Sequence, residues 1–138
     1  MKILVCTDGS ERNKMALDEA TKIITGCKPD EVSLIYVYQP MAFFWEGESM
    51  ENIMKLDEEQ KKKAKEILAE AAKTFEDKNI KANTLLKQGH PAETIISVVS
   101  DQGYDMIILG SKGKGAFLGS VTSPVVQEVK NCTVVVVK

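Results

Sequence analysis

Short apolar segments alternate with amphipathic helical patterns along the whole chain of 138 residues. The apolar segments are predicted strands, because each is short, leans toward β-branched residues and is bounded by turn formers. They cover residues 2–7, 31–38, 80–87, 105–109 and 133–137. Alternating strands and helices predict a parallel sheet, since right-handed crossovers place each helix over a face of the sheet. We therefore expect residues 1–138 to form one doubly wound α/β domain, with five strands and helices on both faces.

Four helices are expected between these strands. The first is capped by Ser10 and ends near Gly26. The second is the clearest, because apolar residues recur at helical spacing in a pattern that runs back to about residue 50. These residues are Ala64, Ile67, Leu68, Ala71, Ala72 and Phe75. The third begins at Pro91, whose missing N–H suits the first helical position, and the fourth ends near Lys130.

A glycine-rich loop follows the fourth predicted strand and leads into the last helix. It holds Gly110, Gly113, Gly115 and Gly119. A strand, a glycine-rich loop and a helix N-terminus together favour phosphate binding, because glycines let the backbone approach an anion and free N–H groups hold it. The same composition is also typical of a surface turn that needs positive φ. Both interpretations stay open from this segment alone.

Two sharper nucleotide motifs are excluded by the residues of this loop. Gly110 and Gly115 have the spacing of a Walker A loop. Ala116 and Phe117 follow them, where that motif needs Lys and then Ser or Thr. A dinucleotide-binding fingerprint would need a third glycine where Leu118 stands. The chain is therefore neither a P-loop NTPase nor an NAD dehydrogenase.

Charge and cysteine content exclude further classes. A net charge of −2 and a pI near 5.5 argue against a nucleic-acid-binding protein, which usually carries a basic surplus. The apolar run of residues 3–6 is too short for a signal sequence or a membrane span, and Asp8 follows it, so we expect a cytoplasmic protein. Cys6, Cys27 and Cys132 are odd in number and lack Cys-x-x-Cys spacing, which argues against a zinc site and against disulfides.

Ligands of doubly wound sheets bind beyond the carboxyl ends of the strands, where the strand order reverses. Asp8 follows the first predicted strand, Val37 lies at the end of the second, and the glycine loop follows the fourth. A carboxylate beside a phosphate cradle can bond a ribose hydroxyl or hold Mg²⁺. The alternative for Asp8 is an Asx-type turn, since Asp8-Gly9-Ser10 is rich in turn formers.

Several blocks of this sequence, in order, resemble the universal stress protein family. They are ILVCTDGSERNKMALDEA from Ile3, QGHPAETII from Gln88, DMIILGSKGKG from Asp105, LGSVTSPVV from Leu118 and TVVVVK from Thr133. The family pattern has an Asp in a turn after strand one and Gly-x2-Gly-x9-Gly-Ser/Thr after strand four. The resemblance covers the whole chain. It implies an adenine-nucleotide α-hydrolase-like sheet of order 3-2-1-4-5, a homodimer joined through Thr133–Val137, and bound ATP or AMP in many members.

The resemblance also implies roles for single residues. Asp8 matches the aspartate on the ribose and metal side of the nucleotide, which makes it the candidate Mg²⁺ contact. Val37 matches a valine that lines the adenine pocket. Gly110 and Gly113 match the first glycine pair, while Gly119 and Ser120 match the closing pair that holds phosphate oxygens. The other candidate nucleotide contacts are Thr7, Lys112, Val121 and Thr122.

The phosphate loop departs from the family pattern. Five residues separate Gly113 and Gly119, where the pattern has nine. Four residues span up to roughly 13 Å when extended, so the cradle cannot keep the same path. Pro124 adds a constraint, because it has no N–H to give to a helix capped at Ser120. We expect Ser123 to be the cap, with Pro124 at the first helical position.

Two functions of different class follow from these observations. The first is a regulatory homodimer of the stress response that binds ATP or AMP with Mg²⁺. Strong catalysis is not expected, because the sequence offers no Ser-His-Asp set, metal cluster or second carboxylate near the loop. Slow hydrolysis of ATP that depends on Asp8 stays open. The second function is a dimeric scaffold that binds no nucleotide and acts through an unidentified protein partner, with Phe43–Trp45 as the candidate surface. His90 is interpreted as a turn residue before Pro91.

Overall fold

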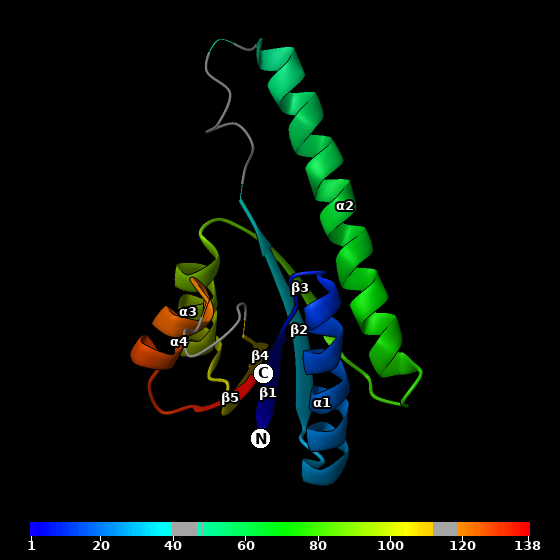
Figure 1. Cartoon of the computed structure of the whole chain (residues 1–138), viewed down its shortest axis with the longest axis vertical. Helices are drawn as coiled ribbons and strands as arrows, with labels where there is room; N and C mark the ends of the chain where they lie inside the picture. Colours follow the sequence, from blue (N-terminus) through cyan, green and yellow to red (C-terminus); the bar gives the residue numbers. More distant parts are fainter. Residues whose placement is uncertain (40–46, 48, 112–118) are drawn as a thin grey trace.

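Five parallel strands form one sheet in the order β3-β2-β1-β4-β5, with helices on both of its faces (Figure 1). The computed structural model describes residues 1–39, 47, 49–111 and 119–138. The elements in chain order are β1 (Lys2–Cys6), α1 (Glu11–Cys27), β2 (Glu31–Tyr38), α2 (Met50–Glu76), β3 (Asn83–Gln88), α3 (Pro91–Gln102), β4 (Met106–Gly110), α4 (Thr122–Glu128) and β5 (Thr133–Val137). The expected fold class and strand order are confirmed. Apart from β3, the expected strand bounds agree with these to within one residue, as do the expected ends of α1 and the expected starts of α2 and α3.

The two faces of the sheet carry separate hydrophobic cores, because successive side chains of a strand point to opposite faces. The core under α1 and α2 comprises Ile3, Val5, Leu17, Ala20, Ile24, Val32, Leu34, Leu68, Ala71, Phe75 and Ile108. The core under α3 and α4 comprises Leu4, Cys6, Ile35, Ile95, Val98, Val99, Tyr104, Ile107, Leu109 and Val125. Burial on both faces explains why β1, β2 and β4 are almost continuously apolar in sequence.

β1 is the central strand and lies where the strand order reverses. It pairs with β2 as far as Cys6 and Ile35. Its pairs with β4 end one residue earlier, at Val5 and Ile108. The chain builds β2 and β3 on one side of β1 before it crosses to β4 and β5 on the other. β1 and β4 therefore separate at their carboxyl ends, and this separation leaves room for a ligand.

β3 begins later than the sequence predicted. The predicted strand started at Ile80, but the observed strand is Asn83–Gln88. Ile80 instead completes the end of α2: its N–H donates to the carbonyl of Phe75 at 2.9 Å, and Asn79 before it has a φ of 60°. This is a Schellman-type ending, which takes Ile80 out of the sheet. β3 is an edge strand in which only the two leucines are half-buried.

The last helix begins neither at Ser120 nor at Ser123, so the predicted capping is wrong. α4 spans Thr122–Glu128, which makes Pro124 its third residue rather than its first. The chain already coils at Gly119, whose carbonyl accepts the N–H of Ser123 at 3.0 Å. Pro124, which has no N–H, thus enters a turn that its neighbours have already formed.

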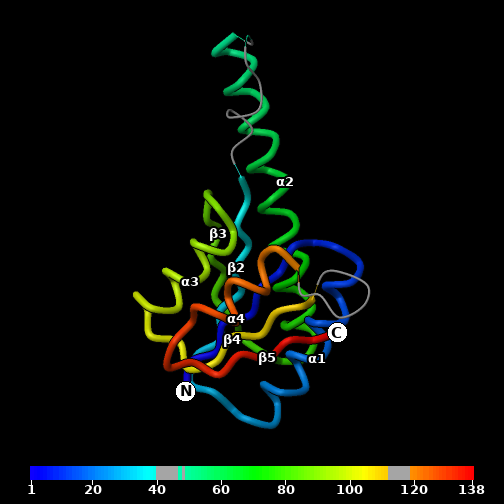
Figure 2. Tube along the Cα trace, turned by 60° about the vertical axis from the view of Figure 1, so that its left-hand side comes forward, coloured from blue at the N-terminus to red at the C-terminus, as the bar shows by residue number. Residues whose placement is uncertain are grey.

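α2 extends beyond the sheet at its N-terminal end (Figures 1 and 2). Its buried residues lie in the C-terminal half of the helix and are Ala64, Leu68, Ala71 and Phe75. In the N-terminal half, Met50 and Met54 are 74% and 61% exposed. Within the described part of the chain, no helix combines the length and the apolar character needed to cross a membrane.

Candidate functional site

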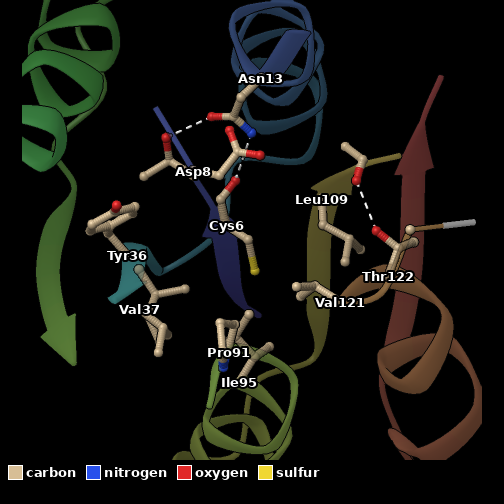
Figure 3. Close-up of a pocket in the computed structure, with 14 residues that line it drawn as sticks. Cys6, Asp8, Asn13, Tyr36, Val37, Pro91, Ile95, Leu109, Val121 and Thr122 are labelled. Atoms are coloured by element: carbon tan, nitrogen blue, oxygen red, sulfur yellow. Dashed lines mark hydrogen bonds between the residues drawn. The ribbon is translucent and has the colours of Figure 1, made fainter. Parts of the chain in front are cut away.

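A cavity of about 200 Å³ opens where the carboxyl ends of β1, β2 and β4 meet the N-terminal ends of α3 and α4 (Figure 3). The residues that line it are Cys6, Thr7, Asp8, Asn13, Ile35, Tyr36, Val37, Pro91, Ile95, Leu109, Gly110, Gly119, Val121 and Thr122. The cavity lies where β1 and β4 separate, which is the position expected for a ligand in a doubly wound sheet.

One wall of the cavity is apolar. β2 contributes Ile35 and Val37, β4 contributes Leu109, α3 contributes Ile95, and Val121 precedes α4. Ile35 of β2, Leu109 of β4 and Ile95 of α3 all belong to the core under α3 and α4. Packing therefore fixes the shape of this wall. A flat apolar group such as an aromatic base fits against a wall of this kind.

The opposite end of the cavity is a buried hydrogen-bond network between β1 and α1. The Thr7 hydroxyl donates to Asn13 Oδ1 at 2.6 Å. Asn13 Nδ2 donates to the carbonyl of Cys6 at 3.2 Å. Thr7 and Asn13 are only 7% and 6% exposed. Because these groups find partners in one another, their burial does not carry the cost of unsatisfied polar atoms.

Asp8 forms an Asx turn at the rim of the cavity. Its Oδ1 accepts the backbone N–H of Ser10 at 2.9 Å and the Ser10 hydroxyl at 2.6 Å. Ser10 is the N-cap of α1, as predicted, because its Oγ accepts the N–H of Asn13 at 3.2 Å. Asp8 also lines the cavity. The two interpretations of Asp8, turn former and ligand contact, are therefore compatible in one geometry.

Two ionisable side chains of the cavity are neutral near pH 7. Burial raises the pKa of Cys6 to about 12. Burial, with the nearby Asp8 carboxylate adding to its effect, also raises the pKa of Tyr36. Cys6 is thus a thiol rather than a nucleophilic thiolate. Cys6 is buried, Cys132 is half-buried and Cys27 is exposed.

A threonine ties α4 to the end of β4 on the far side of the cavity. The Thr122 hydroxyl donates to the carbonyl of Gly110 at 2.9 Å. Thr122 is 3% exposed, so this bond is sheltered from water. It holds Val121 and the start of α4 beside the apolar wall.

Most of the predicted site residues meet at this cavity. Those that line it are Thr7, Asp8, Val37, Gly110, Gly119, Val121 and Thr122. Ser120 is exposed and is not a lining residue. Lys112, Gly113 and Phe43–Trp45 lie outside the described residues. His90 is exposed and precedes α3, as expected, and its side chain makes no capping bond there.

Several lining residues were not predicted. They are Cys6, Asn13, Ile35, Tyr36, Pro91, Ile95 and Leu109. One of them carried a signal in the sequence. Asn13 stands at helical spacing with Ala16, Leu17, Ala20 and Ile24, so it is a polar residue on the buried stripe of α1. A buried polar residue needs partners, and that requirement points to the loop after β1.

A second cavity, of about 180 Å³, lies between α1 and α2. It shares Thr7 and Asn13 with the first cavity, so this pair forms a common wall. Lys14 and Glu70 give its rim mixed charge. Among residues 1–39, 47, 49–111 and 119–138, no three His, Cys, Asp or Glu side chains gather as a metal site would require.

Comparison with known proteins gives a consistent result. The sequence profile of the universal stress protein family matches residues 1–138. The chain is 34% identical to universal stress protein MJ0577 of Methanocaldococcus jannaschii, over 99% of this chain and 94% of that protein. It is 30% identical to universal stress protein YxiE of Bacillus subtilis, over 99% of this chain and 98% of that protein.

Solved structures share the fold. A universal stress protein from Lactobacillus plantarum superposes with a TM-score of 0.83 at 24% identity, covering 100% of this chain and 97% of that one. A universal stress protein in complex with cAMP gives a TM-score of 0.76 at 20% identity, covering 100% and 97% of the two chains. One from Archaeoglobus fulgidus in complex with dAMP gives 0.71 at 20% identity, covering 100% and 98%.

Proposed function

The chain belongs to the universal stress protein family, and we propose that it is a regulatory protein that binds an adenine nucleotide, ATP or AMP. The observation that carries this proposal is the cavity at the carboxyl ends of β1, β2 and β4, with one apolar wall and one polar end. The two neighbours that are complexes with cAMP and dAMP support an adenine nucleotide as the ligand class.

The lining residues suggest how such a nucleotide would lie. The base would rest against Val37, Ile95 and Leu109. The ribose would face Thr7 and Asp8 at the end of β1. The phosphates would then extend toward Gly110 and Gly119, which line the cavity at the end of β4 and before α4.

Mg²⁺ fits this proposal as a companion of the phosphates. Mg²⁺ is usually held by one or two carboxylates together with substrate phosphates and water. Asp8 supplies one carboxylate at the rim of the cavity, and its Oδ1 is already oriented by Ser10. The metal would neutralise phosphate charge beside Asp8. Slow hydrolysis of bound ATP would then depend on Asp8, while catalysis is not proposed as the main role.

We also propose that the protein forms a homodimer through β5, in the cytoplasm. Among the described strands β5 pairs only with β4, so its outer edge is open. Val134 to Val137 are only half-buried, although every one of them is apolar. An apolar open edge of this kind favours pairing with a second copy.

A second candidate function is favoured by one feature of the sequence. The loop between Gly113 and Gly119 has five residues, four fewer than the family's binding pattern. If that loop cannot hold phosphates, the protein would act as a dimeric scaffold that binds no nucleotide and works through a protein partner.

Calorimetric titration of nucleotide-stripped protein with AMP and with Mg-ATP separates the two candidates. We expect micromolar binding by the wild type. Val37→Trp should weaken it by at least about tenfold, because the indole fills the space of the base. Val126→Trp is the control, since Val126 is 40% exposed on α4 and is not a lining residue. No heat from the wild type with either nucleotide at millimolar concentration would favour the scaffold.

A further inference from the structure

We propose that Asn13 is a specificity-determining residue, which makes the cavity select a ligand that brings a hydroxyl donor, such as a ribose, to the end of β1. The inference rests on the proposed nucleotide-binding function and deepens it. It depends on the direction in which each hydrogen bond of the Thr7–Asn13 pair runs.

The orientation of the Asn13 amide is fixed by its neighbours. The carbonyl of Cys6 can only accept, so the Asn13 atom 3.2 Å from it must be the amide nitrogen. Oδ1 therefore faces Thr7, and this oxygen too can only accept. The Thr7 hydroxyl must then be the donor across the 2.6 Å contact. Its single proton is committed to Asn13.

Asn13 occupies this place because β1 and β4 separate there. Cys6 lies one residue beyond the last pair between the two strands, so its carbonyl has no ladder partner in β4. Asn13 Nδ2 satisfies that carbonyl instead. A Cβ added to Gly110 would lie 3.9 Å from Asn13 Nδ2 and 3.4 Å from Ala16 Cβ, so β4 runs close past the amide. Asn13 thus occupies the space between the carboxyl ends of β1 and β4, where the two strands separate.

The end of β1 consequently offers acceptors to a ligand. A threonine oxygen has two lone pairs, and on Thr7 one of them points to the N–H of Gly9 at 3.4 Å. Because its proton is given to Asn13, the Thr7 oxygen, which lines the cavity, can act toward a ligand only as an acceptor. Asp8, next in the chain, is acceptor-only when ionised. On the far side, Thr122 also commits its proton to the protein, through Gly110. Among the described lining residues, Tyr36 is the hydroxyl that stays able to donate.

A ribose hydroxyl matches such an end because it can donate to Thr7. A fluorine in its place keeps the size and the polarity of the substituent but has no proton to give. It would therefore set a lone pair against the Thr7 lone pair. A site whose polar groups require a donor rejects an analogue that lacks one more strongly than an apolar pocket would.

The test compares AMP with 2′-deoxy-2′-fluoro-AMP and 3′-deoxy-3′-fluoro-AMP on the wild type, on Asn13→Leu and on Thr7→Val. In the wild type, at least one fluoro analogue should bind about five- to tenfold more weakly than AMP. The quantity compared is the ratio of the dissociation constant of the fluoro analogue to that of AMP. In Asn13→Leu the Thr7 hydroxyl loses its acceptor and can turn its proton into the cavity, so this ratio should fall to about one. Thr7→Val removes the hydroxyl and should give the same ratio. Thr21→Val is the control: Thr21 is buried on α1, donates to Asp18 and is not a lining residue, so the wild-type ratio should persist.

The ratio separates the proposed role from a merely structural one, which would weaken AMP and its analogues equally. If neither AMP nor Mg-ATP binds the wild type, the nucleotide function and this inference both fail; if only Mg-ATP binds, the same comparison is made with the 2′-fluoro and 3′-fluoro analogues of ATP. If AMP binds and both fluoro analogues bind as tightly, the inference alone fails. A folded Asn13→Leu or Thr7→Val protein that keeps the wild-type ratio also overturns it. If Asn13→Leu does not fold, Thr7→Val and the wild-type comparison still decide.

Discussion

Gly9 lies so close to Ile67 that an added Cβ would be 2.9 Å from Ile67 Cγ2. Gly9 follows Asp8 in the Asx turn, and Ile67 belongs to α2, so this contact joins the rim of the cavity to the longest helix. Gly9 also has a φ of 75°, a region that residues with a Cβ rarely adopt. Both the positive φ and the contact with Ile67 therefore favour glycine at position 9.

Gly9→Ala should consequently lower the free energy of unfolding by about 1–3 kcal/mol and should also weaken nucleotide binding. Gly26→Ala provides the matched control, because nothing lies within 4 Å of its Cβ position and the residue is inside α1. That change should stabilise the protein by roughly 0.5–1 kcal/mol. Urea denaturation of both variants measures the two effects. Equal stability changes in the two would contradict the assigned contact.

Ser10 and Ser49 cap two helices with the same geometry, since each Oγ accepts a backbone N–H at 3.2 Å. Ser10→Ala should cost about 1 kcal/mol of stability. It should also reduce nucleotide affinity, because it removes the hydrogen bond from the Ser10 hydroxyl to Asp8 Oδ1 and leaves only the backbone N–H of residue 10 to orient the carboxylate.

Ser49→Ala removes the equivalent cap of α2, at the end of the helix that extends beyond the sheet. That end can fray without disturbing the core, so the loss of stability should be smaller and nucleotide affinity should not change. Thermal denaturation and calorimetric titration of the pair test the contrast. An unchanged affinity in Ser10→Ala would show that the Ser10 hydroxyl does not position Asp8 for a ligand.

The buried Cys6 thiol predicts a loss of stability in alkali. Its pKa is raised from 9.0 to about 12 in the folded protein. Above pH 9 the unfolded chain releases this proton while the folded chain keeps it, so stability falls as pH rises, by up to about 1.4 kcal/mol per pH unit until pH 12. Cys6→Ala should flatten this part of the stability curve, whereas Cys27→Ala, at an exposed position, should leave it steep. Guanidinium denaturation from pH 8 to 11 reveals the difference between the two slopes.

Features that depend on local sequence were predicted well. The periodicity of α2 and the Ser10 cap of α1 each depend on residues close together in the sequence, and both predictions are confirmed. The start of β3 was predicted wrongly, because Ile80 is apolar but is used to end α2 against Phe75. A sequence window centred on the strand contains no sign of that competing hydrogen bond.

The cavity was predicted in part for a similar reason. Loop residues that follow strands, such as Asp8 and Gly110, are brought together by any parallel sheet of this order, so their meeting could be foreseen. Pro91 and Ile95 enter the cavity from α3, and their contribution depends on how that helix packs over the sheet. The start of α4 was missed because the carbonyl of Gly119 begins the coil before Thr122. Asn13 was also not predicted, although its place on the apolar stripe of α1 was visible in the sequence.

The proposed dimer makes a prediction about two exposed methionines. Met15 and Met54 are both 61% exposed. Met15 lies on α1 in a groove that also includes Val135–Lys138 and Asp18, so a second copy paired along β5 would cover it. Met54 belongs to the N-terminal half of α2. That end of the helix extends beyond the sheet, away from β5 (Figure 2).

Met15→Glu should therefore weaken the dimer by at least about tenfold, because it would bury a carboxylate in the contact between copies, in a groove that already holds Asp18 and Glu19. Met54→Glu adds the same charge at an equally exposed site and should leave the association unchanged. Sedimentation velocity over a range of concentrations measures both. Because Met15 is exposed in the single chain, its substitution should not change monomer stability, and a shift in the sedimentation profile then reports the interface itself. Dimers of equal strength in the two variants would place the contact between copies away from β5.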